Sequence, residues 1–416
     1  MAAITSVAAR VIYNSRASEA VEADIAVEGG FRGRACAPSG ASVGAAEAVS
    51  LPGGGAAEAA RLLREGAAGI VGADAGDVEA VHSALRGLDG TQGWSRVGGS
   101  VAYAVSVAAA EAAANAQGVG LYESLGGADG ARFPYPLGNV LGGGAHAGAG
   151  TPDIQEVLVC PVGAQSVSEA IATNAAVHAE LGKVLRERDT GFTGGRGDEG
   201  GWAPRIGNEE ALEAAARACE RLGHTLGREV ALGVDFASST QWDASRGAYV
   251  YGRSGDVRTP GEQADFAASL IEKYRLVYAE DAVHEEAFGE MAGLAARFPK
   301  TLVTGDDLTA TSAERVRRAA QARSCSGAIL KVNQAGTLRD ALAFAREASR
   351  AGIALVTSHR SGESVDSHIS HIAVATRSAM LKTGVLGGER VAKLNELLRM
   401  SGQGLIQGMA DLGALR

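Results

Sequence analysis

Five charged or titratable residues end successive apolar runs in the second half of the chain, and they carry its clearest chemical signal. They are Asp235, Glu280, Asp306, Lys331 and His359. From Glu280 onward they follow one another at intervals of 25 to 28 residues, the length of one strand-plus-helix unit. A parallel barrel gathers the carboxyl ends of its strands around one mouth, where its chemistry takes place. We therefore expect a metal site with an adjacent base at this mouth.

The three carboxylates of this set offer only oxygen ligands. Such ligands favour a hard cation such as Mg²⁺ over Zn²⁺. A single carboxylate at a strand end usually caps the next helix, but three on successive strand ends are hard to explain as caps alone. We interpret Asp235, Glu280 and Asp306 as metal ligands.

The lysine of the set ends the apolar run GAILK, so we expect its ammonium at the rim of the barrel. Partial burial and a neighbouring cation, such as Lys382, would lower the pKa of Lys331 and make it a usable base. The alternative is an ordinary lysine that forms an ion pair with Asp306 or Glu280.

Two glycine-containing loops carry further candidates. GDEGGWAP places Asp198 and Glu199 beside several glycines, and an exposed Glu199 there could act as an acid or a base. Taken alone, such a segment is more often a turn. SHRSGES combines a histidine, the guanidinium of Arg360 and serine hydroxyls, a set that suits a phosphate group.

Other motif matches do not indicate a function. GASVG, residues 40–44, has the spacing of a hydrolase nucleophile elbow, but Pro38 precedes it and no apolar strand leads in. His368 and His371 share one face of an expected helix, with no third metal ligand nearby. We interpret both as surface or packing histidines.

The elements that must position these residues can be expected from hydrophobic periodicity. Residues 1–60 alternate apolar and polar positions, which predicts an antiparallel meander, and residues 56–125 are typical of helices. From residue 137 onward, short β-branched runs alternate with amphipathic stretches, which predicts a parallel sheet closed into a barrel. The expected class is α/β, with an N-terminal α+β domain over 1–130 and a barrel over 131–416.

Composition excludes several classes of protein. The net charge is −9 and no basic stripe is present, so we expect no nucleic-acid partner. The most apolar stretch, 101–114, contains Glu111 and is too short to span a bilayer, so we expect no membrane partner. Four widely spaced cysteines indicate free thiols in a reducing compartment. We expect a cytoplasmic protein.

Ordered motifs along almost the whole chain resemble the enolase family. They are ARVIYNSR, PSGASVG, LDGTQGWS, LYESLGG, NVLGGGAHAG, IQEVLVCPVGA, GDEGGWAP, GVDFASS, AEDAVHEE, GDDL, LKVNQAGTL, SHRSGES, LKTG and ERVAKLNELLR. The resemblance implies an α+β lid domain, a modified eight-fold β/α barrel of TIM type, two Mg²⁺ ions per site and a homodimer or higher homo-oligomer. It also implies a lyase that removes the proton α to a carboxylate and eliminates water, converting 2-phosphoglycerate to phosphoenolpyruvate.

The resemblance implies a role for each matching residue. Lys331 resembles the base, and Glu199 resembles the acid, with Glu156 beside it. The residues that resemble ligands of the first Mg²⁺ are Asp235, Glu280 and Asp306, while Ser42 resembles a residue that helps to hold the second. Arg360 and Ser361 resemble phosphate contacts. The residues that resemble further catalytic or substrate contacts are Lys382, His359, His146 and Gln155.

Several loops depart from the family pattern. Asn14 and Ala17 replace Asp and Gly, and Val43 replaces a hydroxyl residue on the closing loop; Ala149 and Ala282 lie in two further altered loops. The intact catalytic set favours the glycolytic reaction. The altered loops favour a paralogue that acts on a phosphonate substrate, similar to the carboxyphosphonoenolpyruvate synthases of natural-product pathways. A non-catalytic protein of the same fold is a third hypothesis, disfavoured by the retained set.

Overall fold

The structure is a computed structural model that describes residues 2–41, 44–127 and 129–413. Its N-terminal part contains an antiparallel sheet of β1 (Ile4–Tyr13), β2 (Glu19–Val27) and β3 (Arg32–Cys36). The expected meander is confirmed, although its last strand ends well before residue 60. The helices that follow are α1 (Gly55–Gly66), α2 (Val78–Asp89), α3 (Gly99–Gln117) and α4 (Leu121–Ser124).

Small residues let α3 lie directly on this sheet. A Cβ atom on Gly33 of β3 would come within 2.1 Å of the carbonyl oxygen of Ala108 in α3, so only glycine allows the contact. Almost every alanine of α3 is buried. The high Ala and Gly content of the chain therefore serves close packing in this part of the fold.

The remainder of the chain forms a closed eight-stranded barrel with the order β10-β11-β12-β13-β14-β4-β5-β6. Its strands are β4 (Tyr135–Gly142), β5 (Glu156–Cys160), β6 (Ala231–Asp235), β10 (Tyr278–Glu280), β11 (Leu302–Gly305), β12 (Gly327–Leu330), β13 (Ala354–Ser358) and β14 (Met380–Gly384). The α/β class and the barrel are confirmed.

The expectation of a parallel sheet is wrong for one strand. β5 runs antiparallel to both of its neighbours, β4 and β6, while all other neighbouring pairs are parallel. The structure describes all of residues 143–155 and shows no α-helix there, so the chain turns back from β4 to β5 without the crossover that a parallel pair requires. Consequently the first residue of β5, Glu156, lies opposite Asp235, the last residue of β6.

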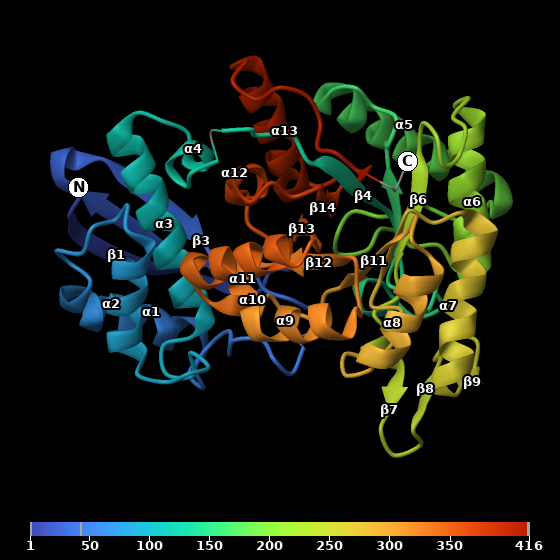
Figure 1. Ribbon diagram of the computed structural model, residues 1–416, viewed down its shortest axis with the longest axis horizontal. Helices are drawn as coiled ribbons and strands as arrows, with labels where there is room; N and C mark the ends of the chain where they lie inside the picture. Colours follow the sequence, from blue (N-terminus) through green and yellow to red (C-terminus); the bar gives the residue numbers. More distant parts are fainter. Residues whose placement is uncertain (1, 42–43, 128, 414–416) are drawn as a thin grey trace.

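Helices surround the barrel, as the amphipathic stretches predict (Figure 1). They are α5 (Val167–Arg188), α6 (Asn208–Arg221), α7 (Pro260–Tyr274), α8 (Phe288–Arg297), α9 (Ala313–Ala322), α10 (Val332–Ala335), α11 (Leu338–Arg350), α12 (His368–Ala375) and α13 (Gly388–Gly402). A small sheet lies at the bottom of Figure 1 and consists of β7 (Trp242–Asp243), β8 (Ala248–Val250) and β9 (Val257–Arg258). None of the helices in the described part of the chain is long and apolar enough to cross a membrane.

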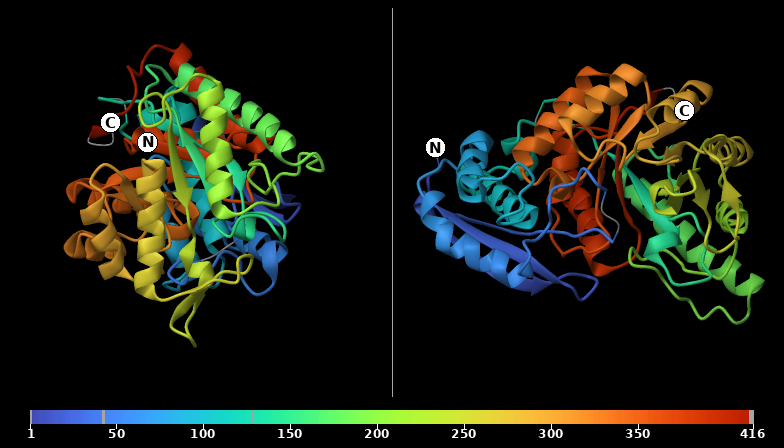
Figure 2. Two further views of the ribbon diagram at one scale, coloured as in Figure 1. Left: turned by 90° about the vertical axis from the view of Figure 1, so that its right-hand side faces the viewer. Right: turned by 90° about the horizontal axis from the view of Figure 1, so that it is seen from below.

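The N-terminal part lies beside the barrel, as Figure 1 and the right-hand view of Figure 2 show, and its loops contact loops at the carboxyl ends of the strands. Ser39 and Gly362 form a backbone bridge, and the Ala48 amide donates to the Gln334 carbonyl at 2.8 Å. The Ser15 amide donates to the Glu363 carbonyl at 2.8 Å. These contacts attach Ser39 and Ala48 to the loops at the barrel mouth.

Candidate active site

The carboxyl ends of the barrel strands surround one cavity, and most residues singled out from the sequence line it. Those residues are His146, Gln155, Glu156, Glu199, Asp235, Asp306, Lys331, His359, Arg360, Ser361 and Lys382. Glu280, the last residue of β10, is fully buried and contacts this set through Lys382. Ser42 lies outside the described residues. Residues that are regularly spaced along the sequence therefore lie close together in the structure.

Lys382 of β14 joins three buried carboxylates. Its Nζ atom lies 2.8 Å from Asp235 Oδ2, 2.6 Å from Glu280 Oε2 and 3.3 Å from Glu156 Oε1. Burial alone would lower the pKa of Lys382, but these carboxylates outweigh burial and raise it well above its usual value. Burial and the charge of Asp235 raise the pKa of Glu280. The cluster thus places three buried carboxyl groups around one ammonium.

Lys331 forms a buried ion pair with Asp306 through Nζ and Oδ2. The expectation that the pKa of Lys331 is lowered is wrong for this arrangement. Burial acts in that direction, but the Asp306 carboxylate outweighs it and raises the pKa of Lys331. The structure therefore shows the alternative that the sequence left open, an ion pair between Lys331 and Asp306. Lys331 still lies directly after β12, where a base was expected.

Glu156 and Glu199 form a second centre, with His146 between them. His146 Nδ1 lies 3.4 Å from Glu156 Oε1 and 3.6 Å from Glu199 Oε1. Burial and the Glu199 charge raise the pKa of Glu156. Burial acts likewise on Glu199, but His359 and His146 outweigh it and hold the pKa of Glu199 well below its usual value. A proton held by this pair therefore resides on Glu156.

Glu199 is buried, whereas the sequence suggested an exposed side chain; Asp198 instead faces outward, with Oδ2 3.1 Å from Nε of Arg16. Two close backbone contacts fix the Glu199 loop. A Cβ atom on Gly200, whose φ is +84°, would lie 2.0 Å from the Leu386 carbonyl oxygen. A Cβ atom on Gly384 would lie equally close to the Glu199 carbonyl oxygen. Glycine is therefore required on both sides of this contact.

The hydrogen bonds of His359 define its tautomer. Arg390 has no acceptor, so its Nη1 donates to His359 Nδ1 at 2.9 Å. His359 Nε2 then carries the proton and donates to Glu199 Oε2 at 3.0 Å. Burial and the Arg390 charge lower the pKa of His359 to about 4, because the Glu199 charge does not offset them. His359 is thus a neutral donor that orients Glu199.

Arg360, expected to bind phosphate, pairs with a carboxylate that the sequence did not single out. Its Nη1 lies 3.0 Å from Glu47 Oε2, and both side chains are almost fully buried. Arg360 and Ser361 both line the cavity. Arg390, also missed, donates from its guanidinium to the carbonyl oxygens of Arg360 at 2.5 Å and Ser361 at 2.6 Å. It shapes the loop that presents both residues.

The donor set suits a hard divalent cation. Among the described residues, two groups have ligand atoms within 4.8 Å of one another: His146, Glu156 and Glu199, and Asp281, Asp306 and Asp307. Asp235, Glu280 and Asp306 do not form one such group; Lys382 contacts the first two, and Lys331 contacts the third. Glu280 Oε1 and Glu156 Oε2 are buried without a hydrogen-bond partner. A cation would satisfy such oxygens.

The remaining residues predicted from the sequence also have definite places. Gln155 Nε2 donates to Asp235 Oδ2 at 3.3 Å. Asn14 Nδ2 donates to Ser39 Oγ at 3.0 Å, so this departure from the family pattern supports the base of the closing loop. Ala282 is fully buried, whereas Ala149 is exposed. Val43 lies outside the described residues.

The base and acid candidates face each other across the mouth. In the closed ring, β12, which precedes Lys331, is four strands away from β5, which begins with Glu156. In an eight-stranded ring that separation is diametrical. A substrate between them can lose a proton to one side and a leaving group to the other.

Comparison with known proteins gives an independent result. The enolase C-terminal TIM barrel domain matches residues 131–407, and the enolase N-terminal domain matches residues 4–125. The chain is 44% identical to an enolase of Methanosphaera stadtmanae, over 98% of this chain and 99% of that protein. It is 45% identical to an enolase of Natronomonas pharaonis, over 96% and 99%. An enolase of Methanothermobacter thermautotrophicus is 42% identical, over 98% and 99%.

Proposed function

Because the chain belongs to the enolase family, we propose that it is a Mg²⁺-dependent phosphopyruvate hydratase that interconverts 2-phosphoglycerate and phosphoenolpyruvate. The observation that carries this proposal is the opposition of two proton-transfer centres. Lys331 lies at one side of the mouth, and the pair Glu156 and Glu199 lies at the other. Removal of water from adjacent carbons needs a base and an acid at two different atoms.

The proton α to a carboxylate is difficult to remove, because the product of that step carries a second negative charge on the same group. Mg²⁺, when bound, supplies positive charge that stabilises such a species. We propose that Asp235, Glu280 and Asp306 bind the first ion and that Ser42 helps to hold a second. The unpaired oxygen of Glu280 supports this assignment.

Residues of the chain carry out proton transfer and bind the substrate. In the proposed mechanism, Lys331 first releases its ammonium proton to solvent and then, as the neutral amine, accepts the α-proton at Nζ. The proton that Glu156 holds and the adjacent Glu199 assist departure of the β-hydroxyl, while neutral His359 keeps Glu199 in place. Arg360 and Ser361 bind the phosphate, and Lys382, His146 and Gln155 contact the rest of the substrate.

The wider setting is also a proposal. We propose that residues 1–130 form a capping domain and residues 131–416 the catalytic barrel. The two family matches support this division, because one ends at residue 125 and the other begins at residue 131. We propose a homodimer or higher homo-oligomer in the cytoplasm, with a small phosphorylated carboxylate as its substrate. Nucleic acid is not an expected partner, since the chain carries a net charge of −9. A membrane is not expected either, because the most apolar stretch, 101–114, is too short to span a bilayer.

The test is an assay of the purified enzyme on 2-phosphoglycerate, following the ultraviolet absorbance of phosphoenolpyruvate with Mg²⁺ and after treatment with EDTA. The proposal predicts turnover of roughly 1–10³ per second with Mg²⁺ and its loss in EDTA. A folded, Mg²⁺-binding protein that leaves 2-phosphoglycerate unchanged but acts on a phosphonate analogue would instead establish the paralogue. Full activity in EDTA would contradict the assignment of the site.

A further inference from the structure

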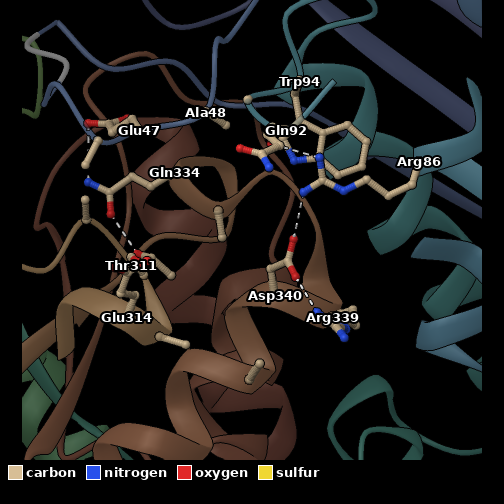
Figure 3. Close-up of a pocket in the computed structure, with 17 residues that line it drawn as sticks. Glu47, Ala48, Arg86, Gln92, Trp94, Thr311, Glu314, Gln334, Arg339 and Asp340 are labelled. Carbon is tan, nitrogen blue, oxygen red and sulfur yellow. Dashed lines mark hydrogen bonds and ion pairs between the residues drawn. The ribbon is translucent and has the colours of Figure 1, made fainter. Parts of the chain in front are cut away.

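Gln334 is buried and lines a second cavity of about 360 Å³ (Figure 3), and its partners Glu47 and Asp306 line the active-site cavity. It belongs to the short helix α10, directly after Lys331 and β12. Figure 3 shows its side chain between Glu47 and Thr311. None of the roles proposed above includes Gln334, although its amide touches residues of both the barrel and the closing loop.

Both ends of the Gln334 amide are hydrogen-bonded. Nε2 donates to Asp306 Oδ1 at 2.9 Å and to Glu47 Oε1 at 3.4 Å. Oε1 accepts from Thr311 Oγ1 at 2.7 Å. The first two partners are carboxylates, and hydrogen bonds to charged groups are stronger than neutral ones. The amide therefore contributes most where it holds Asp306.

Thr311 determines which end of the amide faces Asp306. The backbone N–H of Lys331 donates to Thr311 Oγ1 at 2.9 Å, so the single hydroxyl proton must point elsewhere. Its nearest acceptor is Gln334 Oε1, at 2.7 Å, whereas the Ile329 carbonyl oxygen is 3.4 Å away. An amide flip would set Oε1 against Asp306 and leave Thr311 without this acceptor. The Nε2 end is thus fixed toward the carboxylates.

We propose that Gln334 is a positioning residue for Mg²⁺ binding: it holds Asp306 through Oδ1, so that the other oxygen, Oδ2, which contacts Lys331 Nζ, is left for the ion. This inference rests on the proposed role of Asp306 as a Mg²⁺ ligand. By engaging Oδ1, the amide prevents the carboxylate from rotating freely between Lys331 and the mouth. The second hydrogen bond of the amide goes to Glu47, which also pairs with Arg360. Gln334 therefore links the proposed metal ligand Asp306 to the loop proposed to bind phosphate.

The direct test is isothermal titration of the folded, metal-free protein with MgCl₂, comparing wild type with Gln334→Met, which keeps the side-chain length but removes both hydrogen-bonding ends. We expect Mg²⁺ to bind about 10- to 100-fold more weakly, the usual effect of losing a residue that orients a metal ligand. Asn174→Leu is the matched control, because Asn174 is a buried amide that donates to the Pro136 carbonyl at 2.9 Å. It should lower stability and leave Mg²⁺ affinity unchanged.

Thr311→Val provides a second test that does not depend on the folding of Gln334→Met. It removes the hydroxyl that orients the amide, so Mg²⁺ affinity should fall about 2- to 10-fold. Thr301→Val is its control, since Thr301 donates to the Leu276 carbonyl just before β11, at the opposite end of that strand from Asp306.

Two outcomes separate this inference from the function on which it rests. If wild type binds Mg²⁺ and both Gln334→Met and Thr311→Val bind it within twofold as tightly, the positioning role is refuted and the proposed function stands. If Gln334→Met does not fold, equal affinities of Thr311→Val and Thr301→Val refute the role. Absence of Mg²⁺ binding by the wild type refutes both.

Discussion

Replacement of Lys393 by methionine tests how the loop that presents Arg360 is held. Lys393 Nζ donates to Glu363 Oε2 at 2.9 Å and to the Ser364 carbonyl at 2.6 Å, and Glu363 Oε1 accepts from the Arg360 amide at 3.1 Å. Both side chains of the ion pair are almost fully buried. Removing one partner of such a pair leaves an uncompensated charge and costs about 3–5 kcal/mol. We expect Lys393→Met to lower the free energy of unfolding by that amount at pH 7.5.

The pH dependence of this loss follows from Glu363. Burial acts to raise its pKa, but Lys393 and Arg390 outweigh burial and lower it. A lowered folded pKa stabilises the fold above the unfolded value, near 4.3, and that stability is lost as pH falls. Without Lys393, burial is opposed mainly by Arg390, so the pKa of Glu363 rises. The deficit of the variant should therefore shrink between pH 7.5 and pH 5, where Glu363 takes up a proton.

Urea unfolding at one protein concentration measures the effect. Lys183→Met is the control, because Lys183 is exposed and its ion pair with Glu180, at 2.8 Å, should contribute only about 0–1 kcal/mol. Adding Glu363→Gln to Lys393→Met should recover part of the loss, since glutamine still accepts from the Arg360 amide. A Lys393→Met deficit no larger than that of Lys183→Met, or one independent of pH, would refute the reasoning.

Three further perturbations have definite expected results. The pKa of His359 is about 4 in the folded protein, so His359 binds a proton more readily when the chain is unfolded. The free energy of unfolding of wild type should therefore rise between pH 4 and 6.5, by up to about 3 kcal/mol from this residue. His359→Gln should flatten that rise in urea titrations, and an unchanged pH dependence would argue against this role of His359. Gly200→Ala should reduce kcat about 100-fold by displacing Glu199, whereas Gly255→Ala, also at positive φ but in open space, should leave kcat unchanged; equal rates would contradict the close-contact argument. Asp306→Asn should abolish Mg²⁺ binding in calorimetry while circular dichroism stays unchanged; wild-type affinity would exclude Asp306 as a ligand.

The residues at the ends of parallel strands were predictable because two local properties coincide there. A short apolar run predicts a buried strand, and a charged residue that ends the run must lie at the barrel mouth. Asp235, Glu280, Lys331 and His359 satisfy both conditions, and the structure brings them to one place. Glu156 differs, because it begins an antiparallel strand, and strand direction depends on pairing between distant segments. Its role was implied only by the family resemblance.

Contacts that cross from the N-terminal part to the barrel could not be predicted from periodicity. Glu47 reaches Arg360 only because the closing loop docks on the mouth, and no local pattern marks it. Gln334 follows Lys331 within a quoted motif, but its bond to Asp306 depends on how two loops meet. The predicted direction of the Lys331 pKa shift is wrong for the same reason, because the ion pair with Asp306 that raises this pKa depends on the tertiary structure.

The most direct test of the central claim is incorporation of solvent deuterium at the α-carbon of 2-phosphoglycerate, followed by nuclear magnetic resonance with Mg²⁺ present. The account predicts that wild type exchanges this proton, that Lys331→Ala loses both exchange and elimination, and that Glu199→Gln loses about 10²–10⁴ in elimination but retains exchange. Continued exchange by folded Lys331→Ala would contradict the claim that Lys331 is the base.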